Sequence, residues 1–121
     1  MKSNFSKKEA ACRNGIPYPP AWEYKLKKLF QTLEIIRALT GRSMKLNSVY
    51  RTKEYNKKIN GAKNSQHVKG LAADFVLEGM TPFQLFPILD RFQRLGVIPK
   101  GGLHAYKTFT HIDIRGRIAR W

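Results

Sequence analysis

In two stretches of the chain, the hydrophobic residues are spaced as in a helix. Apolar residues recur every three or four positions over residues 22–40, which predicts a helix with one apolar side that ends at Gly41. A second stretch of this kind, residues 82–95, ends at Gly96 and contains Pro87, which should distort it. We therefore expect two amphipathic helices that each bury one side.

The other apolar positions follow the alternation and the short apolar runs that are typical of strands. Strands are expected over residues 45–50, 71–77, 103–106 and 109–114. A short polar helix is expected over residues 53–60. The order helix, strand, helix, strand, helix, strand, strand indicates an α+β fold, with a small, mainly antiparallel sheet flanked by helices.

Residues 1–21 are expected to form an irregular arm, because three prolines near its end oppose regular structure. Ser6 and Glu9 have the spacing of a capping box on a short helical turn. The length of 121 residues and the 42% of apolar residues predict one domain over residues 1–121 with an ordinary core. The single cysteine, Cys12, excludes an intrachain disulfide and is expected to be a small buried side chain.

Charge adds a prediction about partners. The chain has 23 Lys and Arg against 8 Asp and Glu, a formal net charge of +15. Such a chain is attracted to polyanions, whether nucleic acid, an anionic membrane surface or an acidic cell wall, although a generally solvated basic surface gives the same composition. We expect a monomer with no membrane span, made in the cytoplasm without a signal peptide.

Three side chains suggest a metal site: His67, Asp74 and His111. Two imidazoles and one carboxylate suit Zn²⁺, and a catalytic zinc keeps three protein ligands and one open position. His111 and Asp113 share a face of their strand, whereas His67 needs a bend before Asp74, which Gly70 can supply. These residues alone leave the question open, because such spacings are common and a lone histidine is usually structural or at the surface.

A longer string of residues surrounds these three. The motifs are Ser48-x-Tyr50-Arg51, Ser65-x-His67-x-x-Gly70-x-Ala72-x-Asp74, His111-x-Asp113 and the closing Arg115-Gly116-x-x-Ala119-Arg120-Trp121. Together they resemble the zinc D-alanyl-D-alanine carboxypeptidase family, whose wider group includes lysostaphin-type peptidases and the hedgehog amino-terminal domain. The resemblance covers nearly the whole chain and is closest to short, single-domain members from phages and bacteria.

The resemblance implies a fold of that type, one Zn²⁺ and a substrate class. His67, Asp74 and His111 match the zinc ligands of the family. Arg51 matches an arginine that lies beside the metal and helps to hold the substrate carbonyl, although a salt bridge to an aspartate is an alternative role. The substrates are peptide bonds involving D-amino acids in peptidoglycan stems or crosslinks, and anionic wall polymers are expected as further partners.

The chain departs from the family pattern at the general base. Many members have a glutamate shortly before the last zinc histidine, but residues 106–110 contain no acid. Asp113 shares a face with His111, so it is our candidate for the base. The alternative is that Asp113 accepts a ring N–H from a zinc-bound histidine and orients it.

Three further residues are expected to line the substrate groove: Ser65, Gln66 and His104. A solvated loop position is the alternative for His104. The function that we expect is a zinc-dependent peptidoglycan peptidase, either a phage lysin or a wall-remodelling enzyme, acting after release or as a virion component. The alternatives are a non-catalytic, hedgehog-like zinc domain and a basic nucleic-acid-binding protein. Which bond is cut stays open.

Overall fold

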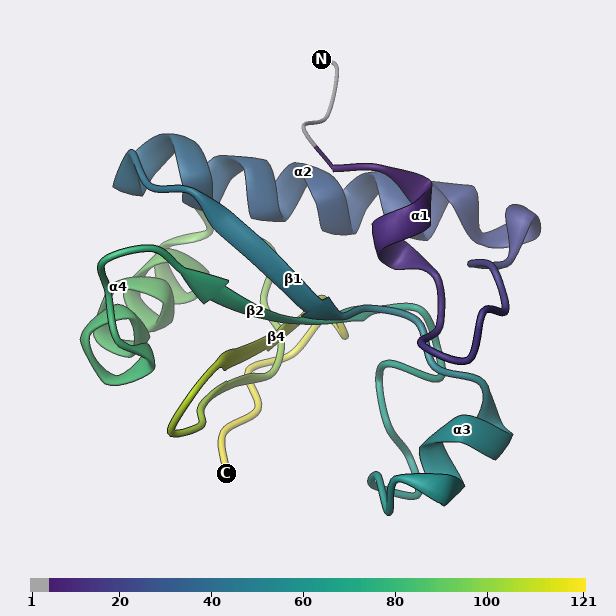
Figure 1. Cartoon of the computed structure of the whole chain (residues 1–121). Helices are drawn as coiled ribbons and strands as arrows, with labels where there is room; N and C mark the ends of the chain where they lie inside the picture. The colour runs from purple at the N-terminus through teal and green to yellow at the C-terminus, as the bar shows by residue number, and fades with distance from the viewer. Residues whose placement is uncertain (1–4) are drawn as a thin grey trace.

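The structure is a computed structural model that describes residues 5–121, and it has the predicted α+β architecture (Figure 1). Its elements are α1 (Lys7–Ala10), the 3₁₀ helix η1 (Pro20–Trp22), α2 (Glu23–Thr40), β1 (Met44–Ser48), α3 (Lys53–Lys58), β2 (Ala72–Leu77), α4 (Pro82–Leu95), β3 (Leu103–Ala105) and β4 (Thr110–Asp113). The strands form one antiparallel sheet in the order β1-β2-β4-β3. No helix within the described range is long and apolar enough to cross a membrane.

Most predicted elements are confirmed, with ends that differ by one or two residues. The predicted arm is less irregular than expected, because its described part contains α1, with a capping box between Ser6 and Glu9, and η1; residues 1–4 lie outside the described range. Helix α4 continues through Pro87 without interruption, because the missing N–H costs only one hydrogen bond and the buried Leu85 and Leu89 hold both sides of it.

One face of the sheet forms the hydrophobic core. Helix α2 runs across the sheet in Figure 1, and side chains from α2 and α4 join those of the strands in a single buried cluster. The strand residues of this cluster are Leu46, Ala73, Phe75, Leu77, Leu103 and Ile112. Because side chains alternate along a strand, the residues between them point to the opposite face.

That opposite face carries a polar row across all four strands. Asp74 pairs with Ser48 on one side and with His111 on the other, and His111 pairs with His104. A register shift between Leu46 and Ser48 brings Ser48, in place of Asn47, opposite Asp74. Since directly opposed residues of antiparallel strands lie on the same face, the register gathers Ser48, Asp74, His111 and His104 in one row.

The bend before β2 occurs at Gly70, as the sequence predicts. Its φ of +74° lies in the left-handed region, and a Cβ atom there would lie 2.6 Å from the Tyr18 hydroxyl. The same hydroxyl donates a 2.6 Å hydrogen bond to the Gly70 carbonyl. The turn therefore has no room for a side chain, and it returns the segment that carries His67 to the end of the sheet.

A Gly70→Ala substitution tests this packing. We expect a loss of about 2–4 kcal/mol in the free energy of unfolding, because the left-handed backbone and the overlap with Tyr18 both cost energy. Chemical denaturation measures it. The matched control is Gly41→Ala, since Gly41 has a φ of +66° and a Cβ atom there would meet nothing within 4 Å; only the backbone cost, about 1–2 kcal/mol, is expected there. Equal losses for both variants would contradict the close approach.

Candidate metal centre

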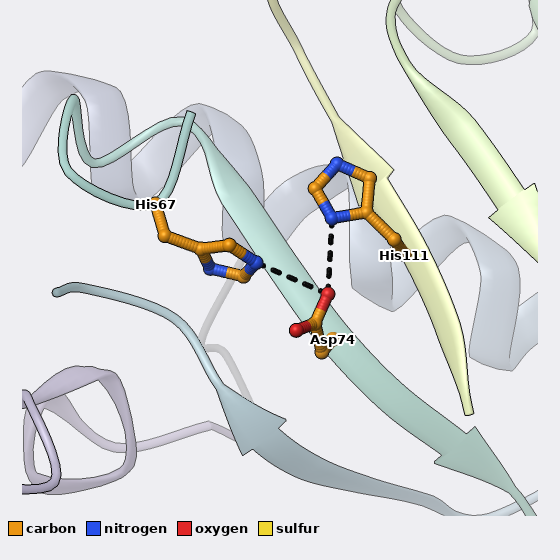
Figure 2. Close-up of side chains that lie close together, drawn as sticks. All are labelled: His67, Asp74 and His111. Carbon is orange, nitrogen blue, oxygen red and sulfur yellow. Dashed lines mark hydrogen bonds and ion pairs between the residues drawn. The ribbon is translucent and has the colours of Figure 1, made fainter. Parts of the chain in front are cut away.

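Three residues distant in the sequence meet on the polar face of the sheet (Figure 2). Asp74 Oδ1 lies 3.0 Å from His111 Nδ1 and 3.1 Å from His67 Nε2. All three side chains are buried, and their candidate ligand atoms lie within 4.8 Å of one another. The structure therefore brings together the residues that the sequence analysis selected as metal ligands.

Different elements position these side chains. Asp74 on β2 and His111 on β4 are directly opposed in the sheet. His67 precedes β2 and lies beside the end of β1, where its backbone carbonyl accepts a 3.1 Å hydrogen bond from the Arg51 N–H. The Oγ of Ser65 accepts a 3.2 Å hydrogen bond from the His67 N–H and fixes the local turn.

Both imidazoles have the hydrogen bonds that metal-bound histidines need. The nitrogen pointing away from Asp74 faces an acceptor in each case: His67 Nδ1 lies 2.7 Å from the Val49 carbonyl, and His111 Nε2 lies 2.9 Å from Asp113 Oδ2. Each acceptor holds a proton on the outer nitrogen of its imidazole, so the inner nitrogens, His67 Nε2 and His111 Nδ1, are the ones placed to bind a metal.

The inner nitrogen of His67, which faces Asp74, has no hydrogen bond within residues 5–121. His67 Nε2 is buried close to Asp74 Oδ1 but is not aligned for a hydrogen bond, and it has no hydrogen-bond partner among the described residues. His111 Nδ1 has Asp74 Oδ1 as a hydrogen-bond partner at 3.0 Å, but the buried lone pair of His67 Nε2 is costly unless a cation binds it. The donor set, two nitrogens and one oxygen, is one that zinc accepts.

Electrostatics favour the ionised carboxylate. Burial alone would raise the pKa of Asp74, but the neighbouring imidazoles of His111 and His67 outweigh it and hold this pKa well below its usual range. Burial would lower the pKa of His111, but hydrogen bonds and charges from Asp113 and Asp74 raise it above its usual value. Asp74 is thus charged at neutral pH, the form in which a carboxylate binds a metal.

Asp113 is fully buried and all of its hydrogen-bonding positions are used. Its Oδ1 accepts from the Gly102 N–H at 2.7 Å and from Arg115 Nε at 2.9 Å, while Oδ2 accepts from Arg115 Nη2 at 2.7 Å and faces His111. Burial raises the pKa of Asp113, but these partners outweigh it and keep this pKa well below its usual range. The arrangement favours the orienting role of Asp113 over that of a base, because a base needs a free lone pair towards the substrate.

Arg51 forms the salt bridge to Asp74 that the sequence analysis considered. Its Nη2 donates to Asp74 Oδ2 at 3.1 Å, its Nη1 to Asn56 Oδ1 at 3.4 Å and its Nε to Ser48 Oγ at 3.3 Å. A guanidinium has five N–H donors, so two remain for another acceptor. Because Arg51 also lines the cleft described next, these donors are available to a substrate.

A cleft of about 560 Å³ opens onto the three candidate ligands. Its lining comes from two segments that form opposite walls: Arg51, Ile59, Asn60, Gly61, Ala62, Asn64, Ser65, Gln66 and His67 on one, and Tyr106, Phe109, His111, Arg115 and Trp121 on the other, with Asp74 between them. In Figure 1, α3 and the turn before β4 lie apart on the same side of the sheet.

Two of the three predicted groove residues line this cleft, Ser65 and Gln66. His104 does not: its ring stacks on Trp121 with 5.3 Å between centroids and an angle of 4° between planes. It is neither a solvated loop residue nor a wall of the cleft, but a support for Trp121. This stacking explains why His104 is only partly exposed.

The sequence analysis missed the aromatic wall formed by Tyr106, Phe109 and Trp121. Strand alternation places Tyr106 on the same face as His104, which was a usable signal. Trp121 had no such signal, because it reaches the site only when the last residues fold back along β3. Backbone hydrogen bonds of 3.2 and 3.3 Å, from Leu103 to Ala119 and from Ala119 to Gly101, hold them there.

A small α+β fold with a buried His-Asp-His group at the floor of a cleft defines a class of proteins, the small hydrolases that use one metal ion. The chain matches the Peptidase M15 family over residues 1–113, and it belongs to this family of D-Ala-D-Ala carboxypeptidase-like zinc peptidases. A search of curated proteins found no match. The family match ends at Asp113, so Arg115 and Trp121 of the cleft lie beyond it.

The orienting role of Asp113 is testable with Asp113→Asn. The amide places an N–H₂ group among donors, so His111 loses its fixed orientation and we expect zinc affinity to fall about 10- to 100-fold. Calorimetric titration of zinc into metal-free protein measures it. The matched control is Asp90→Asn on α4, another carboxylate held by arginines, Arg94 and Arg120, which should leave zinc affinity unchanged. Unchanged affinity in Asp113→Asn together with lost turnover would support the base instead.

Proposed function

We propose that this protein is a zinc-dependent peptidoglycan peptidase that hydrolyses a peptide bond involving D-amino acids in the bacterial cell wall. The observation that carries the proposal is the buried His67–Asp74–His111 group, whose candidate ligand atoms lie within 4.8 Å of one another on the floor of an open cleft. Membership of the Peptidase M15 family supports peptide substrates.

Zinc is the metal that suits these residues best. Its usual ligands are imidazole nitrogen and carboxylate oxygen, and a catalytic site keeps three protein ligands with one position open to solvent. When bound, the ion supplies a water of lowered pKa and polarises the scissile carbonyl. The chain itself fixes the ligands: Val49 and Asp113 hold the two imidazoles, and Arg51 holds the second oxygen of Asp74.

Residues that line the cleft have different roles in substrate binding. Arg51 directs its two unused N–H donors at the carbonyl oxygen, where negative charge develops. Ser65 keeps His67 in place through its backbone N–H, and Gln66 offers an amide to the peptide backbone of the substrate. A substrate segment that lies along the cleft would thus meet a charged wall and an aromatic wall.

The charge of the protein supports an anionic target. With a formal +15, the protein is attracted to wall polymers such as teichoic acids and to the carboxylates of stem peptides. We propose that it acts on the wall after release from the cell that makes it or as part of a virion. A nucleic-acid-binding role predicts salt-dependent DNA binding without hydrolysis, and a non-catalytic zinc domain predicts bound zinc without hydrolysis.

The direct test combines zymography on purified cell walls with mass analysis of products from purified muropeptides. We expect clearing that a chelator abolishes and added zinc restores, and products cut at one defined peptide bond. The matched control is His67→Ala, which removes one metal ligand but keeps the positive surface. Clearing by this variant would mean that the positive charge of the protein, not hydrolysis, disrupts the bacterial cell wall. Stoichiometric zinc without any cleavage would support the non-catalytic alternative.

Arg51→Lys tests the carbonyl-binding role. Lysine keeps the charge but loses the planar fork, so it cannot hold Asp74 and a substrate oxygen together. We expect kcat to fall about 10²- to 10³-fold at saturating zinc, with the metal stoichiometry unchanged. The matched control is Arg94→Lys, an exposed arginine of α4 paired with Asp90, which should keep full activity. Near-normal turnover of Arg51→Lys would contradict the role.

A further inference from the structure

Hydrolysis of an amide needs a proton donor for the departing nitrogen, and the acids of this chain do not provide one. All 8 acidic residues lie within the described range. Asp74 faces the metal position, and Asp113 has no free lone pair and does not line the cleft. The remaining acids, none of which lines the cleft, are Glu9, Glu23, Glu34, Glu54, Glu78 and Asp90.

Among the other groups that line the cleft and carry a proton, one remains as a candidate proton donor. His67 and His111 hold the metal, and an arginine does not release its proton at any ordinary pH. The Ser65 hydroxyl is buried, and an aliphatic alcohol is a much weaker acid than a phenol. The phenol of Tyr106 is the group that remains, and 38% of this residue is exposed, on the wall opposite Arg51.

The ring of Tyr106 is fixed by its neighbours. It stacks on Phe109, with 4.5 Å between the ring centroids. It also makes an edge contact with His104, with 4.4 Å between the ring centroids. The Trp121 indole N–H donates a long, 3.4 Å hydrogen bond to the phenol oxygen. That oxygen accepts from the Trp121 N–H, which leaves its own O–H available as a donor.

From this elimination and geometry, and resting on the proposed peptidase function, we propose that Tyr106 is a catalytic residue that donates its phenol proton to the departing amide nitrogen. Hydrolysis places the OH of water on the carbonyl carbon and a hydrogen on the nitrogen as the C–N bond breaks. Tyr106 supplies that hydrogen, and the resulting phenolate takes back the second proton of the water. The step is balanced and leaves Tyr106 as it began.

Trp121 assists this exchange as a positioning residue. Its N–H donates to the phenol oxygen and holds the ring in place during the two proton transfers. The indole is itself held by stacking on His104 and by the guanidinium of Arg115, which lies 5.5 Å from its ring centroid. The aromatic wall thus has a chemical role as well as a steric one.

The test compares Tyr106→Phe with the unchanged protein on two substrates that differ at one atom. One has an amide at the cleaved bond, and the other has the matching ester, whose alkoxide-type leaving group depends less on a proton donor. We expect kcat to fall about 10²- to 10³-fold on the amide and less than tenfold on the ester. The matched control is Tyr24→Phe, an exposed tyrosine of α2 that is 69% exposed, which should change neither rate.

Two measurements separate chemistry from structure. Zinc affinity, and calorimetric binding of the uncleaved peptide to metal-free protein, should be the same in Tyr106→Phe and in the unchanged protein. Trp121→Phe, which keeps a ring but removes the N–H donor, should show a smaller loss that is again confined to the amide. Equal losses on amide and ester, or a change in KM alone, would overturn the role of Tyr106. Failure of the unchanged protein to cleave either substrate would instead overturn the proposed function.

Discussion

The pairing of β2 with β4 is the constraint on which the site depends. Asp74 lies directly opposite His111, and the next pair, Ala73 and Ile112, is completely buried on the other face. Because side chains alternate, a slip of one residue would expose that apolar pair and send one metal ligand into the core. The burial of apolar side chains against α2 and α4 therefore fixes the geometry of the metal centre, although none of those side chains touches it.

A second set of contacts joins the cleft wall to the same centre. The buried Asn56 of α3 accepts from Arg51 and donates a 2.8 Å hydrogen bond to the Ala62 carbonyl, in the loop that lines the cleft. Gly61 permits this, because a Cβ atom there would lie 2.0 Å from Asn56 Oδ1. Polar groups that are buried without partners are costly, so each of these hydrogen bonds also stabilises the wall in one position.

The sequence was sufficient for the parts of the site that local rules determine. The two-residue period of strands placed Asp74 and His111 on usable faces, and the odd spacing from His67 required the bend that occurs at Gly70. Local rules placed Asp113 near the metal position but did not reveal Gly102 as its partner, since Gly102 reaches it only through the pairing of β3 with β4. The aromatic wall was missed for the same reason.

The charges around the metal position form an alternating row. Arg51 binds Asp74, Asp74 faces His111, His111 faces Asp113, and Asp113 binds Arg115. If His111 binds a metal as a neutral imidazole, two guanidinium charges balance two carboxylates, and the row has no net charge of its own. A divalent ion held there would then add two positive charges to a mostly buried environment, where they would be weakly screened. With a metal held by His67, Asp74 and His111, such a centre would attract anionic groups of a substrate, which is in keeping with the substrate class that we propose.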